Sequence, residues 1–253
     1  MTAFSLAACS DDDSGDSSGG DSEETSSEPP ADLSTVILGE EDAPEGYAYE
    51  GDTFESLAEE FDEMDPESEE ELDELRETMG VLDWNPEECG ELVNGQIEAL
   101  IDDPNLFEGA VSSAYIIEDR GDLGDSVEDP MMLSSMGSYS VALFPGNKAL
   151  EIPDADTCRE ATGSMETEGI SMEMKMSVED WDMEGVEVDG ADDVIATKST
   201  LTLSVDDSGG GMPMEQYGAY GTVNGVDVSV VSQGEADPAV VADLFAKQVE
   251  QLS

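Results

Sequence analysis

The chain has 253 residues and is strongly acidic, with 65 Asp and Glu residues against 7 Lys and Arg and a formal net charge of −58. Nucleic-acid phosphates and anionic lipid headgroups are bound through Lys and Arg, so this charge argues against both as partners. The chain contains no histidine, which excludes Ser-His-Asp and Cys-His catalytic sites and most zinc sites.

Residues 1–9 resemble the lipid-attachment sequence of bacterial lipoproteins. Leu6, Ala7 and Ala8 are the small and apolar residues expected before an acylated Cys9, and a polar run follows at once. A fragment of buried helix is the alternative interpretation. The basic and apolar regions of a signal peptide are missing before Cys9, so we expect the signal to begin upstream. We expect lipid on Cys9 to hold the protein on the extracytoplasmic face of the cell membrane.

Residues 10–32 are predicted to form a disordered acidic tether. The segment consists mostly of Ser, Gly, Asp, Glu and Pro and has no aromatic residue, so it cannot bury enough apolar surface to fold. A calcium loop starting at Asp11 is rejected, because Asp16 stands where such a loop requires glycine. No segment approaches the ~18 apolar residues of a transmembrane helix.

Residues 33–253 are predicted to form a single domain. It begins with the apolar run Leu33–Leu38, and Tyr47–Tyr49 has the alternation of a short extended stretch. Residues 52–79 follow as an acidic helical segment, because their apolar side chains recur at helical spacing and the opposite side is nearly all Asp and Glu.

The two remaining cysteines are predicted to lie in helices. Asn85 would be the N-cap of one helix, with Pro86 at its first position and Cys89 facing inward in its first turn. Cys158 falls in a short helix predicted over Asp154–Thr162. An even pair of cysteines in an exported chain favours a disulfide; two free buried thiols are the alternative.

The second half is predicted to form antiparallel strands and to end in a helix. Asn224-Gly225 predicts a tight hairpin turn, and Asp237 caps a final helix with Pro238 at its first position. We therefore expect an α+β fold, in which helices pack on one face of an antiparallel sheet and the C-terminal helix closes the domain. The predicted strands are Val111–Ile117, Tyr139–Phe144, Ile170–Met176, Val186–Val188, Val194–Val205, Tyr217–Val223 and Val226–Val231.

Several short motifs carry a family resemblance. They are the lipobox and tether, the turn Pro44-Glu45-Gly46-Tyr47, the helix start Pro86-Glu87-Glu88-Cys89, the hairpin over 221–231, and the final helix after Ala236. This layout is similar to actinobacterial exported sensor-like domains, found in lipoproteins and as the extracellular part of PknH-type serine/threonine kinases. The resemblance implies an α+β domain with a disulfide and a cleft that binds a ligand, and it supplies no ligand. A kinase domain and a transmembrane helix are missing here, the cysteines permit one bridge, and residues 52–79 have no counterpart in the family.

The sequence favours a ligand-binding or sensory module of the cell envelope over an enzyme. It has no Gly-x-Ser-x-Gly elbow, Walker loop or dinucleotide fingerprint, and among so many acids no carboxylate pair stands out as a glycosidase site. We predict no catalytic residue, cofactor or dedicated metal site; the acidity is read either as adaptation to high salt or as diffuse binding of divalent cations. The methionines of Met131–Met136 and Met172–Met176 could bind Cu(I), but we favour one face of a strand for the alternating ones.

The alternative function is a structural or assembly lipoprotein that docks another envelope protein without a small-molecule ligand. A well-formed pocket between sheet and helices would favour a ligand, whereas a flat, filled sheet with an exposed apolar patch would favour a protein partner.

Overall fold

A computed structural model describes residues 30, 32–51, 54, 82–102, 108–118, 137–146, 156–167, 170–183, 188, 190–205, 212–234 and 237–253. The lipobox, nearly all of the predicted tether, the acidic helical segment apart from Phe54, and Met131–Met136 lie outside these residues. Within the described part of the chain, no helix is both long and apolar enough to span a membrane.

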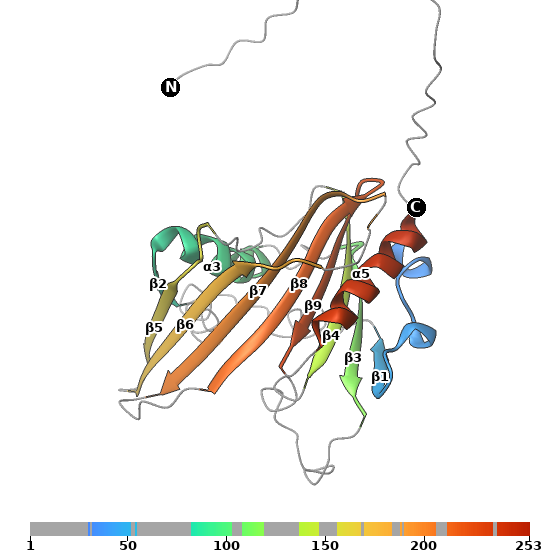
Figure 1. Ribbon diagram of the computed structural model, residues 1–253. Coiled ribbons are helices and arrows are strands. Elements are labelled where there is room, and N and C mark those ends of the chain that lie inside the picture. The colour runs from blue at the N-terminus through green and yellow to red at the C-terminus, as the bar shows by residue number, and fades with distance from the viewer. Residues whose placement is uncertain are drawn as a thin grey trace, which may run out of the picture.

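The described strands form one nine-stranded sheet (Figure 1) in the order β1-β3-β4-β9-β8-β7-β6-β5-β2. All neighbouring strands are antiparallel. The predicted α+β class and the antiparallel sheet are confirmed. The strands are β1 (Tyr47–Gly51), β2 (Asp83–Asn85), β3 (Val111–Ile117), β4 (Ser138–Pro145), β5 (Ala161–Thr167), β6 (Ile170–Asp180), β7 (Asp192–Val205), β8 (Met212–Val223) and β9 (Val226–Gln233).

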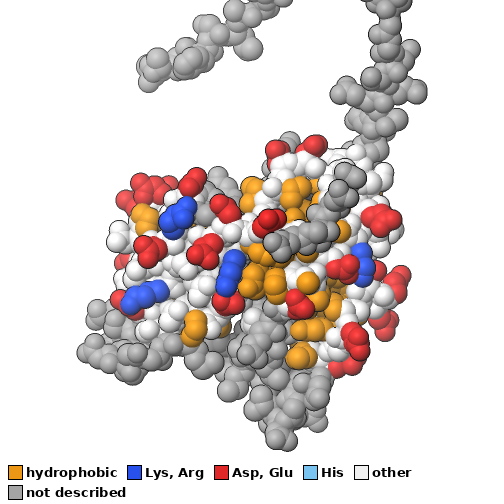
Figure 2. All heavy atoms as spheres, in the orientation of Figure 1, with side chains coloured by type: hydrophobic (Ala, Val, Ile, Leu, Met, Phe, Trp, Pro, Cys, Tyr) orange, Lys and Arg blue, Asp and Glu red, His pale blue; other side chains and the backbone are white. Residues whose placement is uncertain are grey.

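The C-terminal helix α5 (Pro238–Leu252) closes the domain as predicted, packing on β8, β9 and β4. The Asp237 side chain accepts a hydrogen bond from the Ala239 N–H at 2.9 Å, and the Asp237 N–H donates to the Tyr139 hydroxyl at 2.8 Å. Figure 2 shows that hydrophobic side chains gather around this helix on the face that it covers. The buried core beneath it includes Tyr139, Val141, Leu143, Ala219, Val223, Val226, Val228, Val230, Val241, Leu244, Phe245 and Val249.

The segment before β1 is held against α5 by hydrogen bonds to its backbone. Gln248 of α5 is completely buried; its amide nitrogen donates to the Val36 carbonyl at 2.8 Å, and its amide oxygen accepts from the Leu38 N–H at 3.0 Å. The Ser113 hydroxyl donates to the Leu38 carbonyl at 2.6 Å. The apolar run that starts this segment begins as a single 3-10 turn, η1 (Leu33–Thr35), and a second turn, η2 (Glu40–Asp42), follows.

The helix α3 (Glu87–Asp102) is attached to the other end of the sheet. The predicted disulfide is confirmed, with Cys89 of its first turn bonded to Cys158 at an S–S distance of 2.14 Å. Trp84 of β2 packs beneath the helix and donates its indole N–H to the Asn94 side chain at 3.2 Å. Trp84 and the two cysteines share a second, smaller core with Ala161, Met176 and Val178.

The two helices cover opposite faces of the sheet, although the sequence predicted them on one face. Successive residues of a strand point to opposite sides. In β8, Ala219 belongs to the core under α5, and the next residue, Tyr220, lines a cavity together with Val93 of α3 and Met176 of β6. The apolar side of the sheet thus changes from one face to the other between β8 and β6, so each half is covered by its own helix.

The predicted hairpin is confirmed. Asn224 and Gly225 connect β8 and β9 with φ angles of 51° and 77°, as a tight turn with two left-handed residues requires. The Asn224 side-chain amide also donates to the Leu252 carbonyl at 2.8 Å, so the turn satisfies an acceptor at the end of α5.

Two other local predictions are corrected. Residues 156–160 form turns and bends, and β5 starts at Ala161, so the helix predicted over Asp154–Thr162 is wrong in its described part. The disulfide at Cys158 and the pairing of Thr162 with Lys175 of β6 determine the conformation of this segment, and they override its local helical propensity. The second correction concerns the start of α3, for which the sequence predicted Asn85 as the N-cap and Pro86 as the first helical residue. Instead, Asn85 ends strand β2, and the helix begins at Glu87.

Candidate functional site

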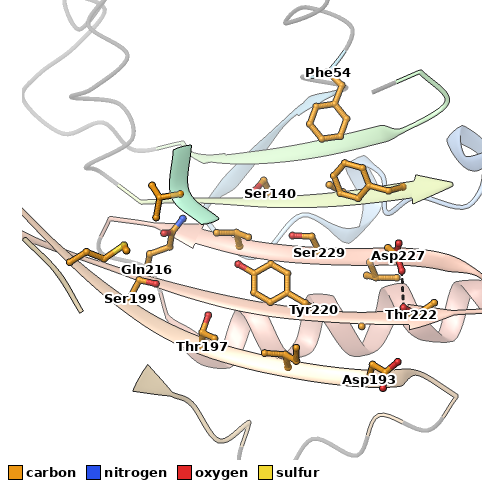
Figure 3. Close-up of a pocket in the computed structure, with 18 of the residues that line it drawn as sticks. Phe54, Ser140, Asp193, Thr197, Ser199, Gln216, Tyr220, Thr222, Asp227 and Ser229 are labelled. Atoms are coloured by element: carbon orange, nitrogen blue, oxygen red, sulfur yellow. Dashed lines mark hydrogen bonds between the residues drawn. The ribbon is translucent and has the colours of Figure 1, made fainter. Parts of the chain in front are cut away.

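A cavity of about 520 Å³ lies on the face of the sheet that carries α3 (Figure 3). Its floor consists of side chains from β4, β7, β8 and β9, and Phe54, Val93 and Met176 add to its walls. Its volume lies within the ~300–1,000 Å³ that is usual for small-molecule sites. Its lining residues are Phe54, Val93, Ser140, Ala142, Phe144, Met176, Asp193, Ile195, Thr197, Ser199, Leu201, Gln216, Tyr220, Gly221, Thr222, Asp227, Val228, Ser229 and Val231.

The Tyr220 ring occupies the middle of the cavity floor (Figure 3). Burial raises the pKa of its phenol to about 12, while a hydrogen bond with Thr197 opposes this shift. The hydroxyl therefore stays protonated at physiological pH and can donate a hydrogen bond. Thr197 is itself only 4 % exposed. The two residues thus form a polar centre in a cavity that is lined by both apolar and polar side chains.

One end of the cavity is acidic. Asp193, Thr222 and Asp227 lie together at this end in Figure 3, and the Thr222 hydroxyl donates to Asp227 Oδ1 at 2.7 Å. Asp193 stands at a bulge in β7, where the pairing with β8 shifts between Asp192 and Ile195, and its φ of 52° is left-handed. A bulge redirects side chains, and here it adds a second carboxylate to the cavity rim.

An aromatic ring borders Asp227, and a second ring packs against the first. Phe144 of β4 is its direct partner across the strands, and directly opposed side chains of one face have Cβ atoms about 4.5–5.5 Å apart. The Phe54 ring lies with its centroid 5.6 Å from that of Phe144. The carboxylate thus sits between a hydroxyl on β8 and an aromatic ring on β4.

At the other end of the cavity, the described lining has no charged side chain. Ser199 and Gln216 lie there in Figure 3, and Leu201 is the strand partner of the buried Met176. From Gln216 to Thr222 the floor follows β8 for six residue steps, which corresponds to about 20 Å of extended strand. The cavity is therefore elongated, with carboxylates at one end and apolar side chains at the other.

The charged residues that the structure describes in this lining are Asp193 and Asp227. Four further side chains bear hydroxyls along the floor, namely Ser140, Thr197, Ser199 and Ser229. No group of three or more His, Cys, Asp or Glu residues in the described part of the chain is arranged to hold a metal ion. The site can thus offer hydrogen bonds, aromatic surface and negative charge to a small molecule.

None of the site residues predicted from the sequence is among the described residues that line the cavity. Cys89 and Cys158 do not line the cavity, but their bond ties α3, which carries Val93, to the sheet. Cys9, Leu6, Ala7 and Ala8 lie outside the described residues. The cavity residues were not predicted, because Ser, Thr, Gln and Asp alternating with apolar residues along a strand have the pattern of a solvent-exposed face.

The chain matches no protein-family model and no curated protein. Among solved structures, it is similar to an uncharacterised protein from Mycobacterium smegmatis, an Rv0999 ortholog. The two sequences are 12% identical, the match covers 68% of this chain and 76% of that one, and the TM-score is 0.37. A likeness at this level carries no argument about fold or function.

Proposed function

We propose that this protein is an exported lipoprotein of the cell envelope that binds a small molecule in the sheet cavity and acts as a ligand-binding or sensory module. The cavity of about 520 Å³, with a polar centre at Tyr220 and Thr197, is the observation that carries the proposal. The motif resemblance to actinobacterial PknH-type sensor-like domains supports the same role. In this proposal, lipid on Cys9 keeps the domain at the extracytoplasmic face of the membrane.

The site favours a ligand over a docked protein. Small-molecule sites are concave and mostly apolar, with a few polar groups that fix the ligand's orientation. The described lining combines apolar side chains such as Phe54, Phe144 and Val93 with the polar pair Tyr220 and Thr197. A flat, filled sheet with an exposed apolar patch would favour a docked protein, and the cavity on this face supports the ligand instead.

Binding without catalysis is the simplest activity for these residues. The chain has no histidine, and Tyr220 holds its proton until about pH 12, which makes it a poor general base at neutral pH. We therefore propose that the domain recognises its ligand and does not transform it.

A matched pair of substitutions tests the proposal. Ser199 lines the cavity, whereas Thr200, the next residue in β7, points to the opposite face. The probe is the neutral fluorophore N-phenyl-1-naphthylamine, titrated into the purified domain. Wild-type protein and Thr200→Phe should bind it equally, and Ser199→Phe should bind at least tenfold more weakly because the ring fills the cavity. Equal binding by Ser199→Phe, with an unchanged circular dichroism spectrum, would refute the proposal.

The anchor is tested separately by metabolic labelling with a radioactive fatty acid. The native gene should yield labelled protein, and Cys9→Ser should yield none. Equal label in both would remove the lipoprotein part of the proposal and leave the cavity untouched.

A further inference from the structure

Resting on the proposed function, we infer that the ligand of the cavity is an organic cation with an apolar body. Its ammonium group binds at the acidic end beside Asp227 and Asp193, and its body lies along the floor over Tyr220 toward Leu201 and Met176.

The head-group position follows from the surroundings of Asp227. Its Oδ1 accepts the Thr222 hydroxyl, and the contacts described for this carboxylate leave Oδ2 to an incoming donor. An ionised carboxylate only accepts hydrogen bonds, so a ligand atom beside it must be a donor or a cation. A ligand carboxylate or phosphate would instead meet like charge from Asp227 and Asp193.

The aromatic side chains select the same charge. Phe144 is the cross-strand neighbour of Asp227 on the cavity side. The centroid of the Phe54 ring lies 5.6 Å from the centroid of the Phe144 ring. The face of an aromatic ring is negative and attracts a cation within about 6 Å, and quaternary ammonium groups are recognised by aromatic cages in this way. A carboxylate beside the Phe144 ring, which itself contacts the Phe54 ring, suits an alkylammonium better than a strongly hydrated metal ion, for which this end offers few oxygen ligands.

The body of the ligand follows from the gradient along the cavity. About 20 Å of β8 separates the residues of the acidic end from Gln216, and the far walls are Leu201, Met176 and Val93. Burial of apolar surface at this far end would add affinity for a hydrocarbon tail. In the middle, the protonated Tyr220 hydroxyl can donate to a single polar atom of the ligand.

The charge of the whole chain acts in the same direction. At −58 it concentrates cations near the protein and repels anions. This long-range attraction is not specific and is screened by salt, so the test must separate it from the cavity.

The test is isothermal titration calorimetry of the full domain with three amphiphiles of equal tail length, each below its micelle-forming concentration and at physiological ionic strength. They are octyltrimethylammonium, the neutral octyl glucoside and the anionic octyl sulfate. We expect the ammonium compound to bind at least tenfold more tightly than the glucoside, and the sulfate to bind most weakly. Ser199→Phe should abolish binding of the ammonium compound.

Three variants locate the charge preference. Asp227→Asn keeps an acceptor for Thr222, and Asp193→Asn suits the left-handed backbone, which asparagine tolerates. Each should weaken ammonium binding at least tenfold and weaken glucoside binding by a much smaller factor. Glu179→Gln removes an exposed carboxylate that pairs across the strands with Lys198, on the opposite face. It should change neither affinity.

The outcomes separate this inference from the function on which it rests. Equal affinities for the three amphiphiles, or a tighter glucoside, would overturn the cationic ligand, while sensitivity to Ser199→Phe would uphold binding in the cavity. An ammonium preference that Glu179→Gln lowers as much as Asp227→Asn would come from diffuse surface charge and would also overturn the inference. If Ser199→Phe leaves all three affinities unchanged, the proposed binding function itself fails.

Discussion

The Tyr220 ring covers the backbone of Gly218, which lies two residues earlier in the same strand, β8. A β-carbon built on Gly218 would stand 2.5 Å from the phenolic oxygen and 2.7 Å from Cε2 of that ring. The two residues share one face of the strand, and the absent side chain of the first provides the space for the second. Gly218 thus positions the hydroxyl at the centre of the cavity without being able to contact a ligand through a side chain of its own.

Gly218→Ala should therefore act through Tyr220. We expect a loss of about 1–3 kcal/mol in the free energy of unfolding, the usual cost of an overpacked site, and weaker binding in the cavity because the ring is displaced. In a Tyr220→Ala background the same substitution should cost nothing or stabilise. Urea denaturation of the four proteins in a double-mutant cycle measures this coupling. The same cost in both backgrounds would show that the ring does not depend on Gly218.

The buried phenols predict how stability depends on alkaline pH. Burial raises the pKa of Tyr220 to about 12 and also raises the pKa values of Tyr115 and Tyr139. A phenol whose pKa is higher in the folded state gives its full stabilisation below its unfolded pKa of about 10 and loses it as the pH rises toward the folded value. The free energy of unfolding should therefore fall between pH 9 and pH 11.

Tyr220→Phe isolates one contribution to that fall. Without this phenol, the decrease from pH 9 to pH 11 should be smaller by about 1.4 kcal/mol, the value of one pKa unit. Urea denaturation at the two pH values gives the comparison. A decrease as large as that of the wild type would mean that Tyr220 ionises normally in the folded protein.

Removal of the disulfide should loosen the wall of the cavity as well as the fold. The bridge joins residues 69 positions apart, and closing a loop of this length stabilises by about 4 kcal/mol in the chain-entropy treatment. A Cys89→Ser, Cys158→Ser double variant should lose stability of this order and bind the neutral fluorophore more weakly, because α3 carries Val93. Cys9→Ser is the control and should match the wild type in both measurements.

Gln248 offers a test of the segment that precedes the sheet. Gln248→Leu keeps an apolar stem but leaves the Leu38 N–H and the Val36 carbonyl without their partner. A buried polar group left unsatisfied costs about 1–3 kcal/mol, and thermal denaturation should show a loss in this range. Gln251→Leu, at an exposed position of the same helix, should change stability little. Similar effects of both substitutions would contradict a specific role for Gln248.

Most of the fold could be predicted because its elements are marked locally. Asp237-Pro238 starts α5, and Asn224-Gly225 forms the hairpin, each where the sequence indicated it. The disulfide followed from the count of cysteines in a chain that the sequence predicts to be exported. These features depend on residues that are neighbours in the sequence or that have few possible partners.

The cavity could not be predicted, because its residues come together only through strand pairing. Asp227 and Phe144 are separated by 83 positions in the numbering yet lie side by side in the sheet. The alternation in β9 of Val226, Val228 and Val230 with Asp227 and Ser229 correctly indicates one buried face. It does not reveal that the polar face lines a cavity to which Val93 of α3 contributes, since that depends on which half of the sheet each helix covers. The assignment of both helices to one face failed for the same reason.

The two outer strands of the sheet have a further consequence. Edge strand β1 has five residues with an irregularity between Tyr49 and Gly51, and β2 has only three residues. Each carries an exposed acid, Glu50 or Asp83. Short, irregular and charged edges resist the addition of a strand from another molecule. If lipid crowds many copies onto one membrane surface, these edges oppose their aggregation into shared sheets.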